Sequence, residues 1–277
     1  MISFSRRATL RRTISATVAC SIACIGISAR SAAQITVVGN TLEEHVGGAG
    51  ETYSGSIQIA NGGTEPAAVR IYQGDYTFSA NGTSSFPDAG SLSRSNARWI
   101  TPDAGVIVVP AGARNSVGYT VRIPNDSALR GTYWSVILVE RVQTPYTNPD
   151  PKSRRLGIGA VMRYGIQVAT YIGDSGPRNI NLLEPRVLLA KDSAASMEID
   201  VLNSGERAYR PVLTLEVYDD RGTKRAHEEI SRGLLYPGAS LKQRFTLGTL
   251  PAGSYKVVVF ADTGDQAVFA RQFRIKL

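Results

Sequence analysis

The chain has 277 residues, enough for one large or two ordinary domains, and its 31 Lys and Arg against 23 Asp and Glu give a net charge of +8. Five of the arginines and no acid lie within residues 1–33, so a chain without that segment would carry only about +3. A charge this small argues against nucleic-acid binding. Both cysteines, Cys20 and Cys24, also lie there, which excludes disulfides and thiol chemistry from the rest of the chain.

Residues 1–33 have the three parts of a secretory signal peptide. Four arginines within 6–12 precede an apolar run over 13–28, and small residues occupy positions 31 and 33. We therefore predict cleavage after residue 33 and an exported, soluble mature chain.

Three other interpretations of this segment fit less well. A membrane anchor would need about 18 apolar residues, more than the run provides. Ser5–Leu10 resembles a twin-arginine signal, although a bulky residue is expected where Thr9 stands. Acylation of Cys20 or Cys24 would make a lipoprotein, but the leucine usual three residues earlier is absent.

Beyond residue 33, short runs of Val, Ile, Tyr and Thr separated by turns predict an all-β protein. Ile57–Gly63 and Ile199–Gly205 both alternate apolar and polar residues and then stop at an Asn and Gly turn. A second pattern, running from a Pro and Gly turn to a Gly-(Thr/Ser)-Tyr strand, occurs at 109–136 and again at 236–257. The repeat predicts two tandem immunoglobulin-like β-sandwich domains, 34–173 and 178–277, joined at a fairly fixed angle by 173–177.

The first copy is longer than the second, mostly around residues 79–98, which are rich in Ser, Asn and Gly. We expect a long surface loop or an extra hairpin there; a loop that binds a partner is the alternative. Trp99 and Trp134 lie in strand-like runs, where packing is favoured over sugar stacking.

The sequence offers no catalytic or metal-binding pattern. Its two histidines, His45 and His227, fall in different domains without a His or Cys at metal-ligand spacing. The acidic doublets at 219–220 and 228–229 are typical of solvated surface, and Asp219–Gly222 is typical of a hairpin turn. No serine stands in a nucleophile elbow, and no Gly-rich phosphate loop follows a strand. We expect no enzyme activity, no cofactor and no small-molecule substrate.

Residues 156–172 carry the strongest functional signal. Nearly all their even positions are apolar, and this alternation over 17 positions far exceeds a strand of about 5–6 residues. One sandwich can cover only part of such a strand, so the remainder would present an apolar ridge at an edge, which proteins normally avoid. A basic, proline-rich loop over 143–155 precedes it.

Tandem sandwiches, export and a long strand ending the first domain resemble the periplasmic chaperones of pilus assembly. The resemblance is carried by Ile57–Asn61, Val109-Pro110, Ile123-Pro124, Tyr133–Val136 and 156–172. In that family the long strand is lent to a pilin subunit by β-augmentation. The resemblance implies that Leu156, Ile158, Ala160 and Met162 are the donor side chains, and that Ile166, Val168 and Thr170 pack the domain's own core.

The chain differs from the family at one site. In the family, an Arg on the first strand and a Lys on the long strand anchor the C-terminal carboxylate of the subunit. Residues 34–69 contain neither Arg nor Lys, and Gln167 stands at the Lys position. The anchor is therefore lost or rebuilt, with Arg163, Arg70 and Gln167 itself as candidates.

The leading hypothesis is a periplasmic chaperone-like protein that binds pilin-like subunits of a surface structure, with transient envelope contact. The alternative is a cell-surface adhesion or envelope-scaffold protein, because Leu235–Gly238, Leu250–Tyr255 and Phe273–Ile275 resemble the closing sandwich of WxL-interacting surface proteins. Exposure of an unpaired 156–162 segment favours the first hypothesis, and pairing of that segment within its own domain favours the second.

Overall fold

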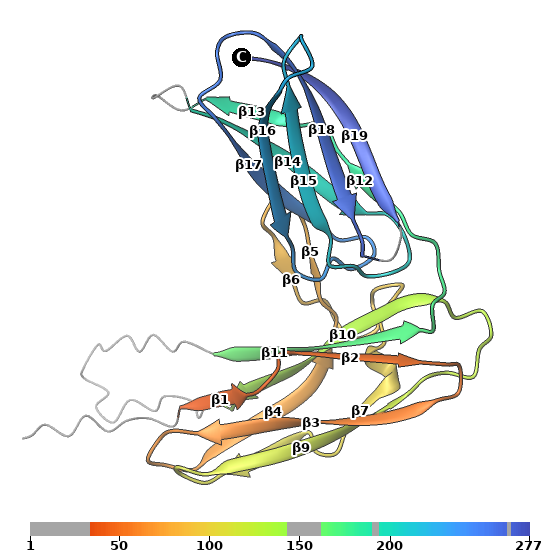
Figure 1. Cartoon of the computed structure of the whole chain (residues 1–277). Helices are drawn as coiled ribbons and strands as arrows, with labels where there is room; N and C mark the ends of the chain where they lie inside the picture. The colour runs from red at the N-terminus through yellow and green to blue at the C-terminus, as the bar shows by residue number, and fades with distance from the viewer. Residues whose placement is uncertain (1–33, 143–161, 190–193, 265–266) are drawn as a thin grey trace, which may run out of the picture. The chain divides into compact units, whose positions relative to one another are not determined.

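The computed structural model describes residues 34–142, 162–189, 194–264 and 267–277, and these are almost entirely β-strand (Figure 1). Strands β1–β11 and β12–β19 form separate sets of sheets, and no strand pair joins the two sets within the described ranges. The predicted all-β fold of two tandem immunoglobulin-like sandwiches is thereby confirmed. The domain limits stay a prediction, and the signal peptide predicted over 1–33 lies outside the described residues.

The first sandwich pairs a four-stranded sheet, ordered β1-β3-β9-β7, with a five-stranded sheet, ordered β2-β11-β10-β4-β8. A short hairpin, β5-β6, and a 3-10 turn, η1, lie outside these sheets. The elements are β1 (Ile35–Val38), β2 (Leu42–Gly47), β3 (Thr52–Asn61), β4 (Ala67–Gly74), β5 (Thr77–Phe78), β6 (Ser84–Ser85), η1 (Ala97–Trp99), β7 (Ile100–Pro102), β8 (Val106–Val109), β9 (Arg114–Arg122), β10 (Gly131–Arg141) and β11 (Arg163–Ile172). Alternation along the strands buries Ile59, Val121 and Ile137 in one core.

The second sandwich also has two sheets. In one, β14 pairs with β12 and β13 along one edge and with β17 along the other; the second is ordered β16-β15-β18-β19. The strands are β12 (Ile180–Leu182), β13 (Arg186–Leu189), β14 (Ala195–Asn203), β15 (Val212–Tyr218), β16 (Lys224–Ser231), β17 (Ser240–Gly248), β18 (Ser254–Asp262) and β19 (Val268–Lys276). Met197, Leu213 and Phe245 are fully buried between the sheets.

The repeated Asn performs the same task in both sandwiches. The Asn61 side-chain amide donates to the carbonyls of Glu65 (2.8 Å) and Val109 (3.0 Å), and its Oδ1 accepts from the Gly63 N–H. The Asn203 amide likewise donates to two carbonyls, at 2.6 and 2.9 Å, and its Oδ1 accepts from the N–H two residues on. Both residues are buried, and each satisfies one fully buried backbone carbonyl, that of Val109 or Leu235.

The first sandwich is longer than the second around residues 79–98, next to the β5-β6 hairpin. The residues after the hairpin are held in place by two buried polar residues, Asp75 and Asn96. The Asp75 carboxylate accepts the Leu92 N–H at 2.7 Å and the Gly90 N–H at 3.2 Å. The Asn96 amide donates to the Val168 carbonyl at 3.1 Å. Of the two forms expected here, a long surface loop or an extra hairpin, the structure shows a hairpin, and the residues after it fold against the sandwich.

Candidate functional site

Strand β11 places two different rows of side chains on its two faces. Ile166 and Val168 point into the core of the first sandwich, 1% and 0% exposed, and Thr170 is buried beside Tyr53, with 2.7 Å between their hydroxyl oxygens. The predicted core half of the long strand is therefore confirmed. Arg163 and Gln167 belong to the opposite, outer face of the sheet.

Burial along the core-facing row falls off towards the start of β11. Val168 and Ile166 are fully buried, Tyr164 is partly buried, and Met162 is 67% exposed. Met162, which directly precedes β11, is thus not covered by the core of the first sandwich. Leu156, Ile158 and Ala160, which would extend the row with the same alternation, lie outside the described residues.

One edge of β11 is only half occupied. Strand β10 pairs with β11 over its whole length, from Arg163 to Ile172. On the other side, the parallel partner β2 begins at Leu42, opposite Gln167. Within the described ranges, the 163–166 stretch has no strand on that side, so its backbone offers a place for another strand to pair.

On the outer face, three strands bring a charged cluster together near the start of β11. Arg163 Nε donates to Glu140 Oε2 at 2.8 Å, and Arg70 also pairs with Glu140. The Tyr72 hydroxyl donates to the same carboxylate at 3.0 Å, and the Arg70 guanidinium lies 4.5 Å from the Tyr72 ring centre. Two half-exposed arginines share one carboxylate, so the cluster keeps a net charge of +1.

Glu140 is held in its charged form. Burial raises the pKa of Glu140, but hydrogen bonds from Arg163, Tyr72 and Arg70 together outweigh burial, so this pKa lies below its ordinary value. The sequence patterns above did not single out this residue. Glu140 could have been found from the sequence, because it is a lone acid at the end of the largely apolar run 133–139. An acid in that position needs a partner.

Gln167 lies apart from this cluster, where the two sandwiches meet. Its Oε1 accepts a hydrogen bond from the Tyr236 hydroxyl at 2.8 Å. The Tyr236 ring stacks on Trp134, with 4.7 Å between ring centres and 10° between planes. Trp134 Nε1 donates to the Tyr76 carbonyl at 2.7 Å. Trp134 is thus a packing residue, as expected, but it packs with the core of the second sandwich. Trp99 packs against the first core.

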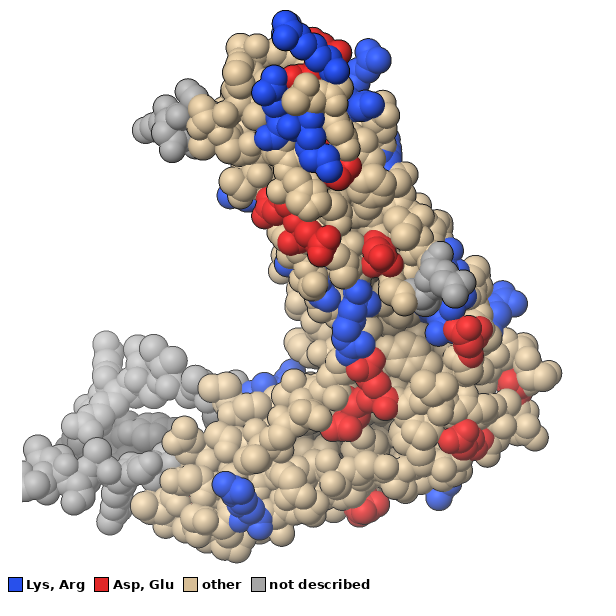
Figure 2. All heavy atoms as spheres, viewed as in Figure 1, with Lys and Arg blue, Asp and Glu red and all other residues tan. Residues whose placement is uncertain are grey.

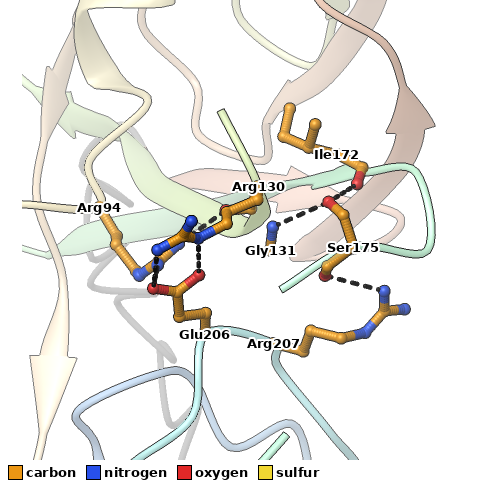
Figure 3. Close-up of polar contacts among 7 residues, drawn as sticks. All are labelled: Arg94, Arg130, Gly131, Ile172, Ser175, Glu206 and Arg207. Carbon is orange, nitrogen blue, oxygen red and sulfur yellow. Dashed lines mark hydrogen bonds and ion pairs between the residues drawn. The ribbon is translucent and has the colours of Figure 1, made fainter. Parts of the chain in front are cut away.

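A second polar contact between the sandwiches centres on Glu206 (Figure 3). Its carboxylate lies 2.7 Å from Arg130 Nε and 3.0 Å from the Arg94 guanidinium, and the hydrogen bond from Arg130 lowers its pKa. The Glu206 carbonyl accepts the Thr132 N–H at 2.7 Å. Gly131 permits this approach because its φ is +74° and a Cβ there would lie 2.1 Å from the Glu206 carbonyl oxygen.

The predicted isolation of the two histidines agrees with their surroundings. His45 stacks on Tyr53, and its Nε2 lies 2.8 Å from Glu51 Oε1, whereas His227 lies in the second sandwich beside Glu216. Among the residues that the structure describes, no three or more His, Cys, Asp and Glu are grouped to hold a metal ion. The same residues contain no helix that is long and apolar enough to cross a membrane.

Searches with the sequence found no matching family model and no matching curated protein. Solved structures do match. A structure of the chaperone–tip adhesin complex of CFA/I fimbriae biogenesis aligns with 86% of this chain and 98% of its own, at 14% identity and a TM-score of 0.47. The class 5 fimbriae chaperone CfaA covers the same shares at 13% identity and a TM-score of 0.45.

A third match is the CsuC–CsuE chaperone–tip subunit pre-assembly complex of Csu pili from Acinetobacter baumannii. It aligns with 89% of this chain and 98% of its own, at 13% identity and a TM-score of 0.41. All three alignments span most of this chain, at identities of 13–14% and TM-scores below 0.5.

Proposed function

We propose that this chain is a periplasmic chaperone-like protein that binds pilin-like subunits of a surface structure by lending them the strand that ends its first sandwich. The observation that carries the proposal is that the core-facing row of β11 is fully buried at Val168 and Ile166, whereas Met162, the apolar residue directly before the strand, is 67% exposed. Apolar side chains of a strand that its own domain does not bury are suited to filling the core of another β-protein.

The half-open edge of β11 supports the same mode of binding. A partner strand added beside 163–166 would hydrogen-bond to the backbone there and continue the five-stranded sheet into the partner. Donor side chains at 156, 158, 160 and 162 would then enter the partner's groove. Four such side chains would contribute several kcal/mol at about 25 cal/mol per Å² of apolar area.

We assign the rebuilt carboxylate anchor to Arg163 and Arg70. Glu140 neutralises only one of the two guanidinium groups, and both are about half exposed. A partner carboxylate on this face would meet the remaining positive charge beside the open edge. Gln167 is less suited to the role, because its side chain is neutral and its Oε1 already accepts from Tyr236.

Photo-crosslinking in the producing cell tests the proposal. A photoreactive amino acid at Ile158 should capture a polypeptide subunit whose own sandwich lacks a strand. The same group at Arg114, exposed on β9, is the matched control and should capture no such subunit. Equal products from both positions, or crosslinks from 158 only to the chain's own first sandwich, would contradict strand donation and favour the scaffold hypothesis.

A further inference from the structure

The last strand of the chain, β19, forms a second open edge, in the second sandwich. It is the end strand of the sheet β16-β15-β18-β19. Leu277 and Gly253 exchange both backbone hydrogen bonds, so alternate residues of β19 point their N–H and C=O groups at β18. The intervening residues Gln272, Arg274 and Lys276 point theirs at the open edge.

Cations gather on the outer face beside this edge. The register places Lys256 of β18 opposite Arg274, and Ser254 opposite Lys276. All three cations are exposed, and none of them has an ion-pair partner within the described ranges. Figure 2 shows Lys and Arg side chains gathered at the end of the second sandwich where Figure 1 marks the C-terminus.

The pairing of Lys256 with Arg274 is unusual in this sandwich. They occupy a non-hydrogen-bonded position, where facing side chains come closest, and like charges there are destabilising. In the other sheet, charges on facing residues are opposite: Arg244 lies 2.6 Å from Glu198, and Lys242 lies 2.8 Å from Asp200. Lys256 and Arg274 therefore face each other as like charges and form no ion pair within the described ranges, although Asp219 and Asp220 line the same hollow beside them.

We infer that the 272–276 edge of β19 binds an extended acidic segment of another polypeptide. Such a segment would pair with the backbone of Gln272, Arg274 and Lys276 and set carboxylates on alternate residues opposite the cations. Further along the same face lie Glu216 and Asp262, which would repel an anionic membrane, so a discrete acidic strand fits the surface better than a lipid layer. This surface is separate from the β11 edge, and the inference stands without the proposed function.

The probe is a nine-residue peptide in which glutamate alternates with valine, titrated into the intact mature chain at low ionic strength. We expect saturable binding and at least tenfold slower amide hydrogen exchange at Gln272 and Arg274. The same peptide with all its amides N-methylated keeps its charge but cannot pair with a strand edge, so its affinity should fall at least tenfold. Equal binding of both peptides would overturn the inference in favour of simple charge attraction.

A charge-reversal variant provides a second test of the inference. Arg274→Glu combined with Lys276→Glu should weaken peptide binding at least tenfold. Its thermal midpoint should stay unchanged or rise, because Lys256 would then face an opposite charge in place of a like one. Arg114→Glu with Lys242→Glu makes the same charge change elsewhere and should leave affinity within twofold. Absence of binding by the unmodified chain would also overturn the inference and leave the basic residues as protection against edge-to-edge association.

Discussion

Arg163 donates from its Nε to Glu140 Oε2 at 2.8 Å, and this contact joins the first residue of β11 to β10. Arg70 reaches the same carboxylate from β4, on the other side of β10. Three neighbouring strands are therefore joined by one acid. The excess positive charge lies beside the edge at which we propose that a partner strand binds.

Replacing the shared acid should weaken the first sandwich. Glu140→Gln leaves two arginines facing each other without a counter-charge, and we expect a loss of about 1–3 kcal/mol in the free energy of unfolding. Urea denaturation of the purified mature chain measures it. Asp174→Asn, which removes an acid that is 80% exposed, is the control and should change stability by less than about 0.5 kcal/mol. A loss no larger than in this control would show that Glu140 does not stabilise the fold.

The same acid predicts a pH dependence. The pKa of Glu140 is lowered in the folded chain, so its contribution to stability is complete above the unfolded value of about 4.5 and is lost as pH falls through the lower folded value. The difference in stability between the natural chain and Glu140→Gln should therefore be constant near pH 7 and shrink below about pH 4.5. A difference that grew on acidification would contradict the assignment.

The paired asparagines should be equally sensitive in the two sandwiches. Asn61→Ala and Asn203→Ala each leave one buried carbonyl, one partly buried carbonyl and one N–H without their partner, and each should lower stability by at least about 2 kcal/mol. Asn181→Ala, an exposed position on β12, should have an effect within about 0.5 kcal/mol. If either buried variant melted like Asn181→Ala, the two turns would not be equivalent.

The contact between the sandwiches includes one stacked aromatic pair, Trp134 and Tyr236. Trp134→Ala removes the stack on Tyr236 and the hydrogen bond to Tyr76, and we expect a loss of about 3–5 kcal/mol. Tyr236→Phe keeps the ring and loses only the hydroxyl that donates to Gln167, so about 1 kcal/mol is expected. Calorimetry of both variants tests the ranking, and equal losses would show that the stack contributes little.

The architecture could be predicted from the sequence because both of its signals are local. Alternation in Ile57–Asn61 and Ile199–Asn203 reports burial on one face of a strand, and the Asn and Gly turn reports the end of that strand. The core role of Ile166 and Val168 was implied by the resemblance to pilus-assembly chaperones, and the burial of both residues confirms it.

Contacts between distant segments could not be predicted in this way. The cluster of Glu140, Arg70 and Arg163 forms only because β4, β10 and β11 are neighbours in one sheet. The sequence of a single strand does not reveal which strands lie beside it. The roles of Gln167 and Trp134 likewise depend on Tyr236, which lies far along the chain and belongs to the other sandwich. The anchor was therefore predicted as a set of three residues, of which the structure brings two together.

Strand donation is tested most directly by the amount of subunit that co-purifies with tagged Ile158→Asp from the producing cells, measured alongside its thermal midpoint. We expect that the subunit is lost at least tenfold while the midpoint stays within about 2 °C of the natural chain, because strand donation requires residue 158 to pack in the partner and not in the core of the first sandwich. Val168→Asp, which puts a charge into that core, should unfold the sandwich. If Ile158→Asp unfolds as readily as Val168→Asp, or keeps its subunit while folded, the chain does not lend this strand.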